Sequence, residues 1–136
     1  MTNSHTEIFV HFVWATWDRE PLIRPEWEAE LYACLAAKCQ ELNANLYEIG
    51  GTENHVHILL RLAATISVAD LAKHLKGSSS HLMNSLHRSS PQFRWQGAYY
   101  ARGVERENLA VVRECIRRQK EHHSVNNLDH NLELID

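Results

Sequence analysis

Two histidines separated by one residue, His55 and His57, are the side chains of this chain best placed to bind a metal ion. They open its most apolar short run, which continues to Leu62. Alternate residues of a β-strand point to opposite faces, so a strand here would direct both imidazoles to one face. Two adjacent imidazoles need one further ligand to hold a divalent cation. Taken alone, the motif is more typical of two ordinary histidines at a strand edge, but the rest of the chain supplies matching parts, so we favour a metal site.

A second set of polar side chains lies near the end of the chain. Cys115, Gln119 and His122 fall on one stripe of a helix that we predict from residue 109 to about 122. The side-chain oxygen of Gln119 is a candidate third ligand for a metal held by the two histidines. A His/His/oxygen site with open positions suits Mg²⁺ or Mn²⁺ acting on phosphate. The alternative is an exposed amide on a basic helix.

Composition indicates a single domain over residues 1–136. The chain is 44% hydrophobic, which is enough for one core at this length. Its first seven residues are polar and lack a secretory pattern, and no apolar run reaches membrane-spanning length. We therefore expect a cytoplasmic protein with no membrane partner. Cys34, Cys39 and Cys115 are odd in number and unevenly spaced, which favours reduced thiols.

The charge is distributed unevenly, although the net charge is only −3. Residues 69–120 hold ten Lys and Arg against four Asp and Glu, whereas the remainder holds four against thirteen. A basic segment on an acidic whole can form a local phosphate-binding surface. A solvated helix face accounts for the same charges equally well.

The hydrophobic pattern predicts alternating strands and helices. The expected elements are a strand at 7–16, a helix from 25 to about 42, strands at 46–50 and 55–62, a helix from 68 to about 86, one or two short strands within 93–104 with an interruption near Gly97, and the last helix. Gly50-Gly51 favours a hairpin between the second and third strands, and Ser67 is a candidate N-cap.

This order predicts an α+β fold of the split β-α-β, ferredoxin-like kind. One antiparallel sheet would carry two helices packed on a single face. The last helix is then an additional C-terminal element, and it carries Cys115 and Gln119.

The chain resembles the small single-tyrosine HUH transposases of insertion sequences and their REP-associated relatives. Five pieces carry the resemblance, in order: residues 9–16 (Phe-Val-His-Phe-Val-Trp-Ala-Thr), 55–60 (His-Val-His-Ile-Leu-Leu), 75–80 (Leu-Lys-Gly-Ser-Ser-Ser), 95–100 (Trp-Gln-Gly-Ala-Tyr-Tyr), and 115–119 (Cys-Ile-Arg-Arg-Gln) with 122–123 (His-His).

The resemblance implies a metal-dependent nuclease and strand transferase that acts on single-stranded DNA. His55, His57 and Gln119 match the family's ligands for Mg²⁺ or Mn²⁺. A tyrosine four residues before that glutamine attacks the scissile phosphate, and the covalent link makes a nucleotide cofactor unnecessary. The resemblance further implies recognition of DNA hairpins, a homodimer that can exchange its C-terminal helices, and a prokaryotic protein associated with the nucleoid when bound to DNA.

The nucleophile position departs from the family, because it holds Cys115 instead of tyrosine. A thiolate would form a phosphorothiolate bond that is weaker than a phosphate ester, and its side chain is shorter. We therefore favour a relative that binds hairpin DNA without cleaving it. Cleavage through the thiol, or through Tyr99 or Tyr100, remains an alternative. A thiol-dependent enzyme using Cys115 with His122 or His123 is another.

A DNA-binding surface is also implied by the resemblance. Hydroxyl and lysine side chains of the 75–80 piece suit phosphate contacts, although a solvated helix turn has the same composition. The candidate DNA-binding residues are Lys76, Ser78, Ser79, Ser80, Arg117 and Arg118. Trp95, Tyr99 and Tyr100 could stack on unpaired bases, but aromatic residues in a strand are more often part of a core.

Overall fold

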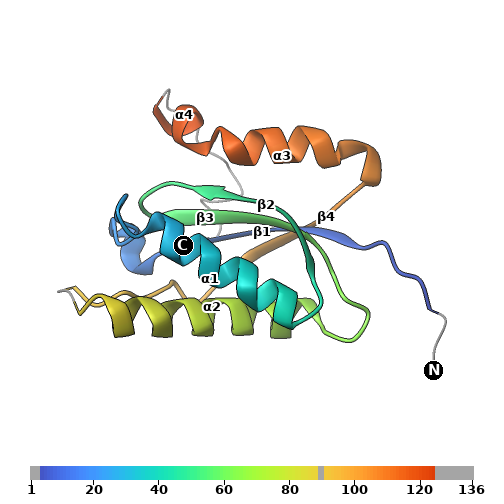
Figure 1. Ribbon diagram of the computed structural model, residues 1–136. Coiled ribbons are helices and arrows are strands. Elements are labelled where there is room, and N and C mark those ends of the chain that lie inside the picture. The colour runs from blue at the N-terminus through green and yellow to red at the C-terminus, as the bar shows by residue number, and fades with distance from the viewer. Residues whose placement is uncertain (1–3, 89–90, 125–136) are drawn as a thin grey trace.

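The computed structural model describes residues 4–88 and 91–124. Its elements, shown in Figure 1, are β1 (Phe9–Ala15), η1 (Trp17–Arg19), α1 (Glu28–Glu41), β2 (Asn45–Gly51), β3 (His55–Arg61), α2 (Val68–Leu86), β4 (Tyr100–Val104), η2 (Arg106–Asn108), α3 (Leu109–Arg117) and α4 (Gln119–Ser124). No helix within these residues is long and apolar enough to cross a membrane.

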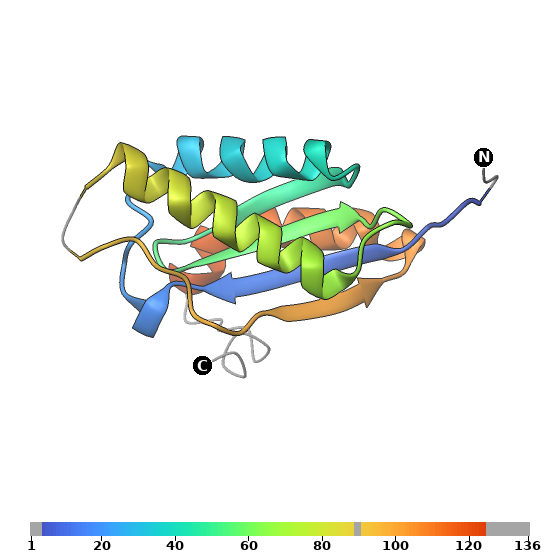
Figure 2. The same cartoon turned by 90° about the horizontal axis from the view of Figure 1, so that it is seen from below.

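The four strands form one antiparallel sheet in the order β2-β3-β1-β4. Helices α1 and α2 cover one face of this sheet, and α3 with α4 lies on the other (Figures 1 and 2). The predicted α+β, ferredoxin-like arrangement with an additional C-terminal helix is therefore confirmed.

Strand β3 is buried on both faces. Val56, Ile58 and Leu60 point into the main core with α1 and α2, whereas His55 and His57 point to the α3 side. All five side chains are buried. A buried polar side chain is costly unless it has hydrogen-bonding partners. The two histidines therefore need partners on the α3 face of the sheet.

Helix α2 is continuous through Ser78, Ser79 and Ser80, although serine is not a strong helix former. Ser67 caps it as predicted, since its hydroxyl accepts a hydrogen bond from the backbone N–H of Asp70 at 3.1 Å. Within the helix, the Ser79 hydroxyl donates to the carbonyl of Leu75 at 2.7 Å. Such back-bonding satisfies the hydroxyl inside the core and leaves the helix intact.

One predicted element differs from the structure. The last helix is not continuous, because Arg118 leaves helical geometry (φ −98°, ψ 18°) and separates α3 from α4. Beyond this break, Lys120 reaches Glu28 at 2.8 Å and the carbonyl of Gly51 at 3.0 Å, which ties α4 to α1 and β2. The 93–104 segment has one strand, β4, as one of the two predicted possibilities, and an isolated bridge between Thr16 and Trp95 precedes it.

Candidate functional site

The three predicted metal ligands lie at one end of the sheet. His55 and His57 are fully buried, and their ring centroids are 5.1 Å apart. Gln119, at the start of α4, is 7% exposed, and its Oε1 lies 3.4 Å from Nε2 of His55. The fold thus brings an amide from the C-terminal helix to the first histidine of the motif, 64 residues earlier in the chain.

The neighbours of His55 favour one position for its ring proton. Its Nδ1 lies 3.0 Å from Oδ1 of Asn54 and 2.8 Å from Oγ1 of Thr52. The Asn54 amide nitrogen donates to the carbonyl of Arg19, so its oxygen faces the ring as an acceptor. This arrangement favours the tautomer with the proton on Nδ1, in which the lone pair of Nε2 is directed toward Gln119.

The Gln119 amide is oriented in the same way. Its Nε2 donates to the carbonyl of Cys115 at 3.1 Å, which leaves Oε1 directed at His55. An imidazole nitrogen and an amide oxygen thus approach each other in a buried place. Nitrogen and oxygen donors of this kind fit a metal of the Mg²⁺ or Mn²⁺ type. Among residues 4–88 and 91–124, no group of three His, Cys, Asp or Glu has a metal-holding arrangement.

A third histidine, His11, belongs to the site and was missed in the sequence. Its Nε2 lies 2.8 Å from Nδ1 of His57, and the two rings stack with centroids 5.1 Å apart. In the β1–β3 register Val13 is opposite His57, which makes His11 its diagonal neighbour. The alternation along β1 places His11 on the α3 face, but only the register identifies its partner. A partner of this kind fixes the orientation of a ligating ring.

Gly50 allows α3 to approach the sheet closely enough to complete the site. A Cβ at this position would lie 2.3 Å from the backbone oxygen of Ile116, whose side chain is buried beneath the helix. Any other residue would push α3 away from β2. Because Gln119 follows Ile116 by three residues, this contact also determines how near its amide comes to His55.

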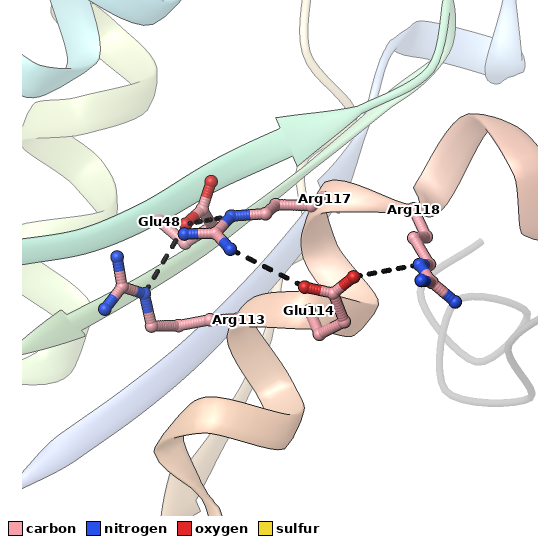
Figure 3. Close-up of polar contacts among 5 residues, drawn as sticks. All are labelled: Glu48, Arg113, Glu114, Arg117 and Arg118. Carbon is pink, nitrogen blue, oxygen red and sulfur yellow. Dashed lines mark hydrogen bonds and ion pairs between the residues drawn. The ribbon is translucent and has the colours of Figure 1, made fainter.

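Ion pairs orient α3 on β2 (Figure 3). Glu48 of β2 lies 3.5 Å from Arg113 and 3.2 Å from Arg117, and Glu114 pairs with Arg117 at 3.5 Å and Arg118 at 2.9 Å. Each exposed pair contributes at most about 1 kcal/mol. The two arginines predicted to bind DNA therefore already have carboxylate partners, which a phosphate would have to replace.

Cys115 is exposed on α3, directly before the buried Ile116. The other two thiols are held within α1: burial raises the pKa of Cys34, and it raises the pKa of Cys39 to about 11. An exposed thiol is the chemically accessible one. His122 is part of the thiol-enzyme hypothesis, but its side chain, like that of His123, lies outside the described residues.

Two of the predicted DNA contacts have a structural role in the fold. Ser79 is fully buried, and its hydroxyl accepts a hydrogen bond from Nε1 of Trp95 at 2.9 Å, so this hydroxyl is already bonded within the fold. Lys76 donates to the carbonyls of residues 96–98 at 2.6, 3.1 and 3.3 Å. Burial lowers the pKa of Lys76. The 75–80 and 95–100 segments are thus joined by these hydrogen bonds.

The chain thus combines a ferredoxin-like sheet, a buried His-x-His pair and a C-terminal helix that faces this pair. The family model described as "Transposase IS200 like" matches residues 4–119. The chain therefore belongs to the IS200-like transposase family.

Solved structures share this fold. A candidate transposase from Deinococcus radiodurans R1 superposes with a TM-score of 0.69 at 20% identity, covering 93% of this chain and 95% of that one. A REP-associated tyrosine transposase bound to a REP hairpin gives a TM-score of 0.66 at 8% identity, covering 94% and 74%. A comparison with curated protein sequences found no match.

Replacing Gly50 with alanine should displace α3, because the new methyl group would meet the Ile116 backbone. We expect the free energy of unfolding to fall by about 1–3 kcal/mol, as for other overpacked sites. Gly77→Ala is the control: it has open space in the interior of α2 and should raise stability by up to about 1 kcal/mol. Urea denaturation of both variants measures the difference, and equal stability of Gly50→Ala and the parent would contradict the close approach.

Proposed function

We propose that this protein binds single-stranded and hairpin DNA at a divalent-metal centre built for strand nicking and transfer, and that cleavage is impaired because Cys115 stands at the nucleophile position. His55, His57 and Gln119 would hold Mg²⁺ or Mn²⁺, which polarises the scissile phosphate when bound. The observation that carries the proposal is the buried approach of Oε1 of Gln119 to Nε2 of His55, at 3.4 Å. Membership of a transposase family supports a phosphodiester as the substrate.

Several neighbouring residues would prepare the ligands for the ion. Thr52 and Asn54 keep the proton of His55 on Nδ1, and His11 orients the ring of His57. The carbonyl of Cys115 fixes the Gln119 amide. The ligands are thus held before an ion arrives, which lowers the cost of organising the centre.

The DNA partner is proposed from the family and from its hairpin-bound structural relative. Ser78 and Ser80 are half-buried hydroxyls on α2, and Arg117 and Arg118 are exposed cations that could exchange their carboxylates for phosphates. Lys76 supports the surface from beneath through residues 96–98. We place this activity in the cytoplasm of a prokaryotic cell, at the nucleoid when DNA is bound.

A homodimer is also proposed, as in the family. Here Gln119 meets His55 of its own chain, so the ligand set can form without an exchange of helices. In an exchanged dimer, the partner's helix would make the same close approach to Gly50.

A second candidate function is favoured by Cys115: a hairpin-binding module that does not cleave. The thiol is shorter than a phenol and forms a weaker ester, whereas the proposed metal ligands are all present. The thiol-dependent enzyme has less support. Arg113, Arg117 and Arg118, the cations near Cys115 in the sequence, are paired with Glu48 and Glu114, so their charges already have carboxylate partners.

Removing the Gln119 amide should weaken Mn²⁺ binding. We expect Gln119→Ala to lose at least about 10-fold in affinity by calorimetry, since one of three protein ligands is gone. Gln119→Glu should retain binding, because a carboxylate oxygen replaces the amide oxygen. Gln40→Ala, an exposed glutamine of α1, is the matched control. Unchanged affinity in Gln119→Ala would refute the proposed ligand set.

His11→Phe should preserve the stacked ring but remove the nitrogen that contacts His57. We expect Mn²⁺ affinity to fall about 10- to 100-fold, the usual effect of losing a partner behind a ligand. Titration by calorimetry measures the change, with His74→Phe on the exposed side of α2 as control. Equal losses in both variants would mean that His11 has no specific role.

Cys115→Tyr should restore the nucleophile of the family. We expect the parent to bind labelled hairpin DNA without a covalent product, and Cys115→Tyr to give a protein–DNA adduct on a denaturing gel with Mn²⁺. An adduct formed by the parent and lost in Cys115→Ser would establish the thiol as the nucleophile instead. If neither protein binds DNA, the proposed function is wrong.

A further inference from the structure

We propose that Trp17 and Arg94 form a stacking site for one unpaired nucleobase beside the metal centre, an inference that rests on the proposed function. Of the four tryptophans, Trp17 is the one that lies exposed, at 41%, while Trp14 and Trp95 are buried. The guanidinium of Arg94 sits 3.7 Å from the centroid of the Trp17 ring. The indole thus lies at the surface with a guanidinium over its ring instead of within the core.

The backbone beneath this pair is firmly held. The N–H of Trp17 donates to the carbonyl of Arg94 at 2.8 Å, and the N–H of Asp18 donates to the Gln96 side chain at 3.1 Å. Asp18 and Arg19 both have positive φ, 52° and 53°, which is unfavourable for residues other than glycine. Conformations of this kind persist only where surrounding contacts enforce them, and they gather at ligand sites. Trp17 is thus presented by a rigid turn.

The pair lies close to the proposed ligands. Ala15 pairs with His55 in the β1–β3 register, and the N–H of Thr16 donates to the carbonyl of Asn54 at 2.9 Å. Trp17 is two residues beyond Ala15, so its Cα and that of His55 are at most roughly 13 Å apart. Figure 1 shows η1 at the same end of the sheet as the β2–β3 turn and α4. A DNA strand with one phosphate at the histidines would pass this turn within a few nucleotides.

The chemistry of the pair suits an unpaired base. Indole and guanidinium planes both stack on bases, and every base offers a π face, so the contact tolerates sequence. Bases within a hairpin stem are already stacked and paired, and cannot offer a face to an isolated side chain. The positive charge of Arg94 also complements the phosphates on either side. We therefore assign the site to the single-stranded flank of the hairpin rather than to its stem.

A purely structural cation–π pair is the competing explanation. In that case Arg94 only fastens residues 92–98 to η1, and changing Trp17 alters stability without changing which DNA binds. A protein partner seated on the indole is the other competing occupant, and it too leaves the affinity for DNA unchanged.

The test compares two DNA probes, a hairpin with a single-stranded extension on each side and the same hairpin without extensions. Trp17→Ala should bind the extended probe about 10-fold more weakly than the parent and the blunt probe equally well. Trp17→Phe, which keeps a ring, should stay within about 3-fold of the parent. Leu86→Ala, another exposed apolar residue, is the control and should bind both probes normally.

An abasic scan of the extensions then identifies the nucleotide. One abasic position should weaken the parent about 10-fold and leave Trp17→Ala unaffected, because the stacking partner is already absent. Arg94→Lys keeps the positive charge but removes the planar guanidinium, so the abasic nucleotide should reduce its affinity less than it reduces that of the parent. This variant covers the case in which Trp17→Ala fails to fold. Equal binding of the extended probe by the parent and Trp17→Ala overturns the inference alone. Failure of the parent to bind either probe overturns the proposed function, and the inference with it.

Discussion

The contact between Gly50 and the backbone of Ile116 is the constraint on which the candidate site depends. A helix normally rests on a sheet through its side chains, and here one strand residue has none, so the carbonyl of Ile116 occupies the place of a Cβ. That approach lowers α3 onto β2 and positions Gln119 at His55. The charges of Arg113 and Arg117 at Glu48 orient the helix about this contact. A site assembled from segments so distant in sequence needs a fixed distance between its layers, and a glycine provides it.

The same end of the sheet serves both proposed DNA contacts. Asn54 accepts from the ring of His55 through its side chain, and through its backbone carbonyl it accepts from Thr16, the residue before Trp17. Residues 95–98 are in turn fastened to α2 by Lys76 and Ser79. The proposed metal ligands and the exposed indole are therefore attached to one hydrogen-bonded framework, so a DNA strand held at one position would be held in register with the other.

The sequence was sufficient for the order of elements, because alternating and 3.6-residue patterns are local properties. It was also sufficient to place His55 and His57 on one face of β3. The role of His11 could not be predicted, since it depends on the register between β1 and β3. Nor could the burial of Ser79, whose partner, Trp95, comes from a segment that only the tertiary fold brings near. The break at Arg118 likewise follows from contacts of Lys120 with other elements rather than from helix propensity.

Cys115 shows that two chemical demands are separated on this helix. The proposed metal ligands are buried and held by hydrogen bonds, whereas a nucleophile has to be accessible and long enough to reach the phosphate. Cys115 lies on the exposed side of α3, and it orients Gln119 through its backbone carbonyl alone. Any side chain at position 115 leaves that hydrogen bond intact. The fold can therefore lose or change its nucleophile without disturbing the proposed metal ligands, so the presence of the ligand set and the capacity to cleave are independent properties of this chain.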